Sequence, residues 1–136
     1  MIILVDKKYI VFVNRLWDKE STKYYTNLQY VDAPSFNSNK EKNSVVALNI
    51  TIPELGLVDS DPVFSSEFPE YLFFLRTKDG KNDIYFIDFP PKETSVPQKL
   101  SDYVLNIANL KLLKNTLVFS AEVYFDCEDF ACTKEK

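Results

Sequence analysis

The sequence predicts an all-β fold, and three observations support this prediction. Aromatic residues make up 15% of the 136 residues, with eleven Phe and eight Tyr, and large flat side chains favour half-buried pleated surfaces. The apolar segments are short runs of strand length. Asp79-Gly80 stands between two such runs, which is the strongest short-range hairpin signal in the chain. With 46% hydrophobic residues, the chain can bury the core of one ordinary domain.

The first half of the chain predicts three strands separated by polar segments. Residues 9–13 are a compact aromatic and β-branched run, which indicates a buried strand. Residues 24–31 alternate in polarity and suit a strand paired to the first one across the polar stretch 18–23. Residues 32–43 contain a Pro and show no periodicity, so they predict a loop, and strand character resumes over residues 44–52.

The second half of the chain contains the clearest hairpin. Its two strands are predicted at residues 71–76 and 83–88, and Pro90-Pro91 stops the second one because Pro lacks the N–H group that a strand ladder needs. The spacing of the next apolar region is compatible with a strand or a short helix, and we favour a strand. The last two predicted strands cover residues 103–113 and 117–124.

Three segments resemble one another and indicate an internal repeat. Each has a polar residue followed by an apolar strand, with Phe12, Phe74 and Phe119 at the same place. These Phe residues lie 62 and 45 residues apart, and the second interval fits the roughly forty to fifty residues of one propeller blade. The polar loop after Asp32 accounts for the excess in the first interval. On the repeat alone, a propeller and another all-β domain with aromatic strands are both compatible with the sequence.

Residues 119–134 (FSAEVYFDCEDFACTK) form a long and unusual string. It resembles a propeller segment of the bacterial-type dipeptidyl-peptidases and acylaminoacyl-peptidases of the prolyl oligopeptidase family, in which a strand F-S-x-E-V-[FY] runs into a loop x-D-C-x-D-x-A-C-T-K. Residues 60–65 and 71–75 resemble the strands on either side of that family's S-P-D-G-K turn, and residues 98–103 resemble the segment that closes one blade. The resemblance covers most of the chain, from about residue 9 to residue 134.

This resemblance implies a partial, antiparallel β-propeller of about two blades plus the start of a third, in one domain over residues 1–136. The first blade would cover about residues 4–52, the second about 59–101, and the third would start within about 104–136. The family's turn glycine is missing from all three corresponding turns, so these turns must differ in conformation; they lie at residues 4–8, 66–70 and 112–116.

The function that the resemblance implies is that of a non-catalytic segment. In the family, the propeller lies over an α/β-hydrolase domain, restricts entry to short peptides and helps to hold the N-terminal end of the substrate. The expected partners are therefore the hydrolase domain of the same parent serine peptidase and a short peptide. An incomplete propeller also leaves strand edges unpaired, so we expect self-association through open blade edges.

We expect no catalytic residue and no enzymatic activity in the chain itself. It contains no His, so a Ser-His-Asp triad cannot form, and it has no G-x-S-x-G motif. Two alternatives remain open. One is a self-contained β-sandwich that works as a binding or interaction module without catalysis. The other is an inactive relic that binds peptides without cleaving them.

The two cysteines, Cys127 and Cys132, are the candidate disulfide. They flank a four-residue segment, and the sequence is equally compatible with a disulfide that closes this short loop and with two free thiols. A zinc site would need further ligands from elsewhere. The neighbouring acidic residues are better explained as a solvated loop than as a calcium site, so we expect no metal and no cofactor; these residues are Asp126, Glu128 and Asp129.

Three further residues have local explanations. Asp59 and Asp61 are interpreted as turn-forming side chains on either side of Ser60. Trp17 is interpreted as a packing residue near the first hairpin rather than as a platform for a ligand.

The charge pattern argues against a nucleic-acid partner. The chain has 16 basic and 20 acidic residues, a net charge of −4, and the two signs are interspersed. The apolar start is interrupted at Asp6, too early for a signal peptide, and no apolar run approaches the length of a membrane helix. We therefore expect a soluble chain without a membrane partner. Its compartment stays open, with the cytoplasm slightly favoured.

Overall fold

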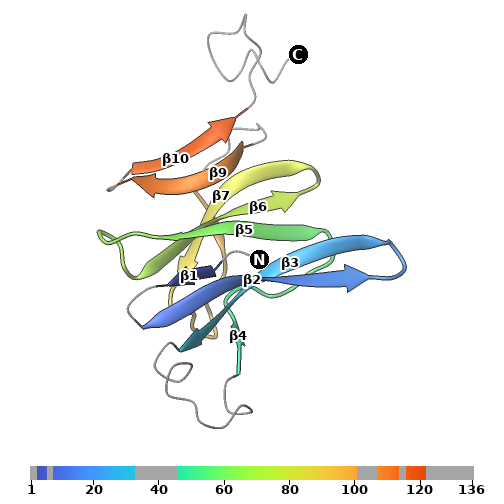
Figure 1. Ribbon diagram of the computed structural model, residues 1–136, viewed down its shortest axis with the longest axis horizontal. Coiled ribbons are helices and arrows are strands. Elements are labelled where there is room, and N and C mark those ends of the chain that lie inside the picture. Colours follow the sequence, from blue (N-terminus) through green and yellow to red (C-terminus); the bar gives the residue numbers. More distant parts are fainter. Residues whose placement is uncertain (1–2, 6–7, 33–45, 101–106, 114–115, 122–136) are drawn as a thin grey trace, which may run out of the picture.

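The computed structural model describes residues 3–5, 8–32, 46–100, 107–113 and 116–121, and for residues 3–5 it describes the backbone alone. Within these residues every regular element is a β-strand, so the predicted all-β class is confirmed. The strands form two successive antiparallel meanders followed by a hairpin, and Figure 1 shows these three units one after another along the molecule.

The first meander consists of β1 (Ile3–Val5), β2 (Tyr9–Asp18), β3 (Lys23–Asp32) and β4 (Leu48–Asn49). Each strand pairs antiparallel with the next one in the sequence. β2 extends well beyond the predicted residues 9–13 because its entire length pairs with β3.

The strand predicted over residues 44–52 is shorter than expected. Residues 44 and 45 lie outside the described part, and of the remainder only Leu48–Asn49 is a strand. The reason is that the backbone N–H groups of Ile50 and Thr51 both donate to the Leu28 carbonyl oxygen, at 2.8 and 3.2 Å. Two consecutive donors on one acceptor require a bend, so the chain leaves the ladder there.

The second meander consists of β5 (Leu57–Phe64), β6 (Tyr71–Lys78), β7 (Lys81–Asp88) and β8 (Gln98–Lys99). Again each strand pairs antiparallel with the next. The predicted hairpin turn is confirmed: Asp79 and Gly80 have φ angles of 53° and 77°, and two successive left-handed residues are typical of a type I′ turn. β7 ends directly before Phe89 and Pro90, as predicted.

The hairpin consists of β9 (Ile107–Leu113) and β10 (Thr116–Ala121). The strand interpretation of residues 103–113 is confirmed from residue 107 onward, and that of residues 117–124 is confirmed up to residue 121. Residues 103–106 and 122–124 lie outside the described part.

The two meanders join into one open sheet at a single point. β3 and β5 share one parallel bridge, Thr26 to Val58. The Thr26 hydroxyl donates to the Asp59 carbonyl oxygen at 2.6 Å and supports this bridge. In the described part of the chain neither sheet closes on itself.

The two meanders repeat each other in register. β6 begins 62 residues after β2, and β10 begins 45 residues after β6. Tyr9 pairs with Asp32 as Tyr71 pairs with Asp88. The N–H of Leu100 donates to the Ile84 carbonyl oxygen at 2.7 Å, in the same place as the bond from Ile50 to Leu28. The corresponding strands are therefore separated by the same 62 and 45 residues as Phe12, Phe74 and Phe119.

The apolar core lies in two clusters, one at each boundary between units. The first interface joins the two meanders, and its buried residues are Val11, Leu28, Ile50, Leu72, Phe74, Ile87 and Phe89. The second interface joins the second meander to the hairpin, and its buried residues are Leu75, Ile84, Ile107 and Leu110.

Candidate functional site

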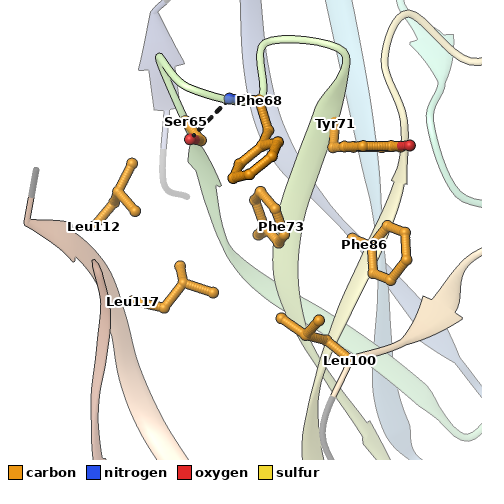
Figure 2. Close-up of a pocket in the computed structure, with 8 residues that line it drawn as sticks. All are labelled: Ser65, Phe68, Tyr71, Phe73, Phe86, Leu100, Leu112 and Leu117. Atoms are coloured by element: carbon orange, nitrogen blue, oxygen red, sulfur yellow. Dashed lines mark hydrogen bonds between the residues drawn. The ribbon is translucent and has the colours of Figure 1, made fainter. Parts of the chain in front are cut away.

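An apolar pocket of roughly 340 Å³ opens at the second interface. Figure 2 shows four aromatic side chains of the second meander on one side and two leucines of the hairpin facing them across the pocket. Its lining residues are Ser65, Phe68, Tyr71, Phe73, Phe86, Leu100, Leu112 and Leu117.

The aromatic wall of this pocket is ordered by two contacts between rings, one edge to face and one tilted. Tyr71 and Phe86 meet edge to face with ring centroids 5.4 Å apart, and Phe73 lies 6.2 Å from Phe86. The buried Ser65 hydroxyl accepts a hydrogen bond from the Phe68 backbone N–H at 3.2 Å, which fixes the turn before β6 (Figure 2). Such a wall suits an apolar or aromatic group, because little in it can hydrogen-bond a polar one.

A second, charged pocket of roughly 200 Å³ lies near the β6–β7 turn. At its base, Arg76 makes a bidentate ion pair with Asp59: Nε to Oδ1 is 2.7 Å and Nη2 to Oδ2 is 3.1 Å. The guanidinium also lies over the rings of Phe74 and Tyr85, at 5.6 and 5.3 Å from their centroids. Asp59 is fully buried, so this pair is a built part of the structure and not a surface contact.

Asp83 lies in the same pocket and is 6% exposed. Its Oδ2 is 3.4 Å from the Lys99 ammonium group, and its Oδ1 has no hydrogen-bond partner among the described residues. The other charged side chains of the pocket are Lys78, Asp79 and Lys81. Side chains of both charges therefore line this pocket, and they can hydrogen-bond a small polar group.

The interpretation of Asp59 and Asp61 as turn-forming side chains is wrong. Both lie inside β5, the first strand of the second meander. Asp59 is the partner of Arg76, its neighbour across the strands. Asp61 occupies a bulge with a φ of 52°, and its carboxylate accepts a hydrogen bond from the Leu110 N–H at 3.1 Å. Sequence spacing missed both roles because the partners are 17 and 49 residues away.

The other candidate residues have mixed outcomes. Cys127 and Cys132, with the acidic residues between and before them, lie outside the described residues. Trp17 packs on Tyr24 with ring centroids 4.7 Å apart, as a packing residue should, although it is 49% exposed. In the part of the chain that the structure describes, no three His, Cys, Asp or Glu side chains are grouped so that they would hold a metal ion.

The apolar pocket was not predicted from the sequence, yet a signal for it existed. Tyr71 and Phe73 lie 62 residues after Tyr9 and Val11, so the repeat could have placed them at a boundary between units. That Leu112 and Leu117 line the pocket depends on how the hairpin packs against the second meander. The spacing of the repeat in the sequence does not predict this packing.

The geometry thus defines a class of fold. The described residues form an open array of repeated antiparallel β units, and an apolar pocket lies between the second meander and the hairpin. No protein-family model, curated protein or solved structure matches the chain. Among the described residues, no helix has the length and apolar character needed to cross a membrane.

Proposed function

We propose that this chain is the opening part of a β-propeller, the non-catalytic domain of a prolyl-oligopeptidase-type serine peptidase of the dipeptidyl-peptidase or acylaminoacyl-peptidase kind. The two meanders are its first two blades, and the β9–β10 hairpin starts the third. Its role is to gate and position short peptides for an α/β-hydrolase domain of the same parent protein.

The observation that carries the proposal is the repeated register of the two meanders. A propeller blade is a four-stranded antiparallel meander, and successive blades repeat the same pairing. Here each of two consecutive four-stranded units pairs its strands in chain order. Each unit also ends with one matching hydrogen bond, from Ile50 to Leu28 in the first and from Leu100 to Ile84 in the second.

The alternation of faces supports the same proposal. In β6, Leu72 and Phe74 face the first meander, whereas Leu75 faces the hairpin. In β10, Leu117 and Phe119 face back toward the second meander. The second meander therefore offers one face to the unit before it and the other face to the unit after it, as a blade in a stack does.

The exposed face of the hairpin favours the propeller over the self-contained sandwich. Leu113 is 64% exposed and Val118 is 41% exposed, and both lie on the face of the hairpin that points away from the second interface. A sandwich covers the inner faces of both its sheets. The outward apolar side chains suit a chain in which a further unit follows.

The choice of family is supported by the sequence resemblance. The segments at residues 60–65 and 71–75, which resemble the strands around the S-P-D-G-K turn, pair antiparallel as parts of β5 and β6. The absence of His from the chain agrees with a catalytic centre located elsewhere in the parent protein.

The experiment compares the chain with the complete product of its coding region. Each is purified and assayed for release of p-nitroaniline from dipeptidyl and acylaminoacyl p-nitroanilides. We expect activity from the complete product, inhibition by a serine-directed fluorophosphonate, and no activity from the 136-residue chain. A complete product that lacks a hydrolase domain, or that does not react with the fluorophosphonate, would overturn the proposal.

A further inference from the structure

The charged pocket near the β6–β7 turn is lined from one face of three adjacent strands. Residues two positions apart face the same side of a strand. The lining residues are Arg76 and Lys78 of β6, Lys81, Asp83 and Tyr85 of β7, and Lys99 of β8, with Asp79 in the turn. Arg76 pairs with Asp83, and Lys78 pairs with Lys81. The strand register therefore holds these charged side chains next to one another.

Two lysines stand directly opposite each other in this pocket. Lys78 ends β6 and Lys81 begins β7, and the two residues pair across the turn. Like charges in directly opposite positions destabilise a pair of strands. Lys99 adds a third ammonium group, whereas the guanidinium of Arg76 already has Asp59 as its counterion. The lining has only two carboxylates against these three ammonium groups, so the pocket attracts a small anion.

Asp83 gives the same pocket an acceptor that lacks a donor. Its side chain is 8% exposed, and its Oδ2 lies 3.4 Å from the Lys99 ammonium group. Its Oδ1 has no hydrogen-bond partner within the described part of the chain, which is costly for a buried polar atom. A carboxylate can only accept hydrogen bonds, so the missing partner is a donor. Because the Cβ–Cγ torsion of Asp is broad, a turn of the carboxylate presents Oδ1 to the pocket.

We propose that this pocket binds inorganic phosphate. Its P–OH group donates to Asp83, and its anionic oxygens accept from the ammonium groups of Lys78, Lys81 and Lys99. Inorganic phosphate keeps at least one P–OH group at neutral pH, so it supplies the negative charge and the donor together. The pocket volume of roughly 200 Å³ suits an oxyanion of this size.

The two requirements, negative charge and a donor, distinguish inorganic phosphate from other small ligands. Sulfate has a similar size and charge but carries no proton at neutral pH, so it cannot donate to Asp83. A phosphate monoester has a second pKa of about 6, so it is mostly unprotonated at neutral pH. An amine or a metal ion would satisfy Asp83 but would add positive charge beside three ammonium groups.

This inference does not rest on the proposed function. It uses only side chains of the second meander and would hold for an interaction module as well as for a propeller. A negative result with phosphate leaves the peptidase assay unaffected, and a negative peptidase assay leaves the phosphate result unaffected.

The test is isothermal titration calorimetry of the full chain with sodium phosphate and with sodium sulfate, at neutral pH in a phosphate-free buffer. The ionic strength is kept constant, because salt screens exposed charges. We expect saturable binding of phosphate and at least tenfold weaker binding of sulfate. No saturable binding of phosphate, or equal affinity for the two anions, would overturn the inference. This comparison uses the unmodified chain and does not depend on the folding of any variant.

One variant tests the role of Asp83. Asp83→Asn places an amide N–H group in the pocket, which can donate to any oxyanion oxygen. The affinity for sulfate should therefore rise, and the two anions should bind within about threefold of each other. Circular dichroism spectra check that the variant keeps the fold. A folded Asp83→Asn chain that still prefers phosphate at least tenfold would overturn the inference.

A matched pair of lysine variants locates the site. Lys81→Gln removes one cation from the pocket and should weaken the binding of phosphate at least fivefold. Lys92→Gln makes the same change of charge beyond the opposite end of β7 and should leave the affinity within about twofold. Equal effects of the two substitutions would show that phosphate does not bind in this pocket and would overturn the inference.

Discussion

The two interfaces between the units are built from the same strand pattern, yet they differ in completeness. The first interface buries seven apolar residues and encloses the ring of Phe89. The second interface buries four, and it opens into a pocket whose rim residues Phe68 and Leu100 are 47% and 49% exposed. Among the described residues, a whole meander covers the first face, whereas the two strands of the hairpin cover the second.

The two interfaces also differ in their polar contacts. Across the first interface, the Thr26 hydroxyl donates to the carbonyl oxygen of Asp59, and the side chain of Asp59 is itself held inside the second meander by the bidentate pair with Arg76. The second interface is held by two single hydrogen bonds, from the Leu110 N–H to Asp61 and from the Asn82 side-chain amide to the Ile107 carbonyl oxygen at 2.7 Å. Among the described residues, the hairpin is therefore held by fewer contacts than the first meander, and the following predictions test this comparison.

The largest effect is expected from Arg76→Met. This substitution leaves the fully buried Asp59 carboxylate without its cation, and breaking a buried pair in this way costs about 3–5 kcal/mol. The free energy of unfolding, measured by urea denaturation, should fall by that amount. Arg15→Met is the matched control, because Arg15 is exposed and lies over the Tyr24 ring; a loss there as large as in Arg76→Met would contradict the comparison.

Phe89→Ala should lower the free energy of unfolding by about 3 kcal/mol, because it leaves a cavity among three rings in the first interface. Phe68→Ala removes the same ring from the rim of the second interface. Since Phe68 is about half exposed, the loss there should stay below about 1 kcal/mol. Similar losses in the two variants, measured by thermal and urea unfolding, would show that the interfaces do not differ.

Asp61→Ala tests the attachment of the hairpin. It removes the acceptor for the Leu110 N–H and places Ala at a φ of 52°, so we expect a cost of about 1–2 kcal/mol. Hydrogen exchange should accelerate in β9 and β10 more than in β2 and β3. Asp61→Asn keeps an acceptor oxygen and a residue type that tolerates this conformation, so its effect should be smaller; uniform acceleration in all strands would contradict the prediction.

The smallest effect concerns Tyr30 in the first interface. Burial raises the pKa of its phenol, and the neighbouring Tyr9 adds to the shift. The folded state therefore favours the neutral phenol. Its contribution to stability is complete below the unfolded-state pKa of about 10 and is lost as the pH rises through the folded-state pKa. Tyr30→Phe should flatten the decrease of the unfolding free energy above pH 10, and an unchanged slope would contradict this cause.

Much of the local structure could be predicted from residue patterns alone. The compact run at residues 9–13, the Asp79-Gly80 turn and the Pro after β7 each act within a few residues, so their consequences appear in the sequence. The prediction failed where a group distant in the sequence, in the backbone or in a side chain, decided the outcome. Hydrogen bonds from Ile50 and Thr51 to the Leu28 carbonyl oxygen end β4 earlier than predicted. The ion pair with Arg76 holds Asp59 as a buried strand residue, where the sequence had predicted a turn residue.

The amino-acid sequence by itself determined the all-β class, the main hairpins and the intervals of 62 and 45 residues between corresponding strands. It did so because strand propensity, turn chemistry and repeat length are properties of neighbouring residues. Only the tertiary structure decided which faces are covered, where Asp59 finds its cation, and that Tyr71, Phe86 and Leu112 line one pocket. These outcomes depend on how separate units pack, and packing joins residues that no local pattern connects.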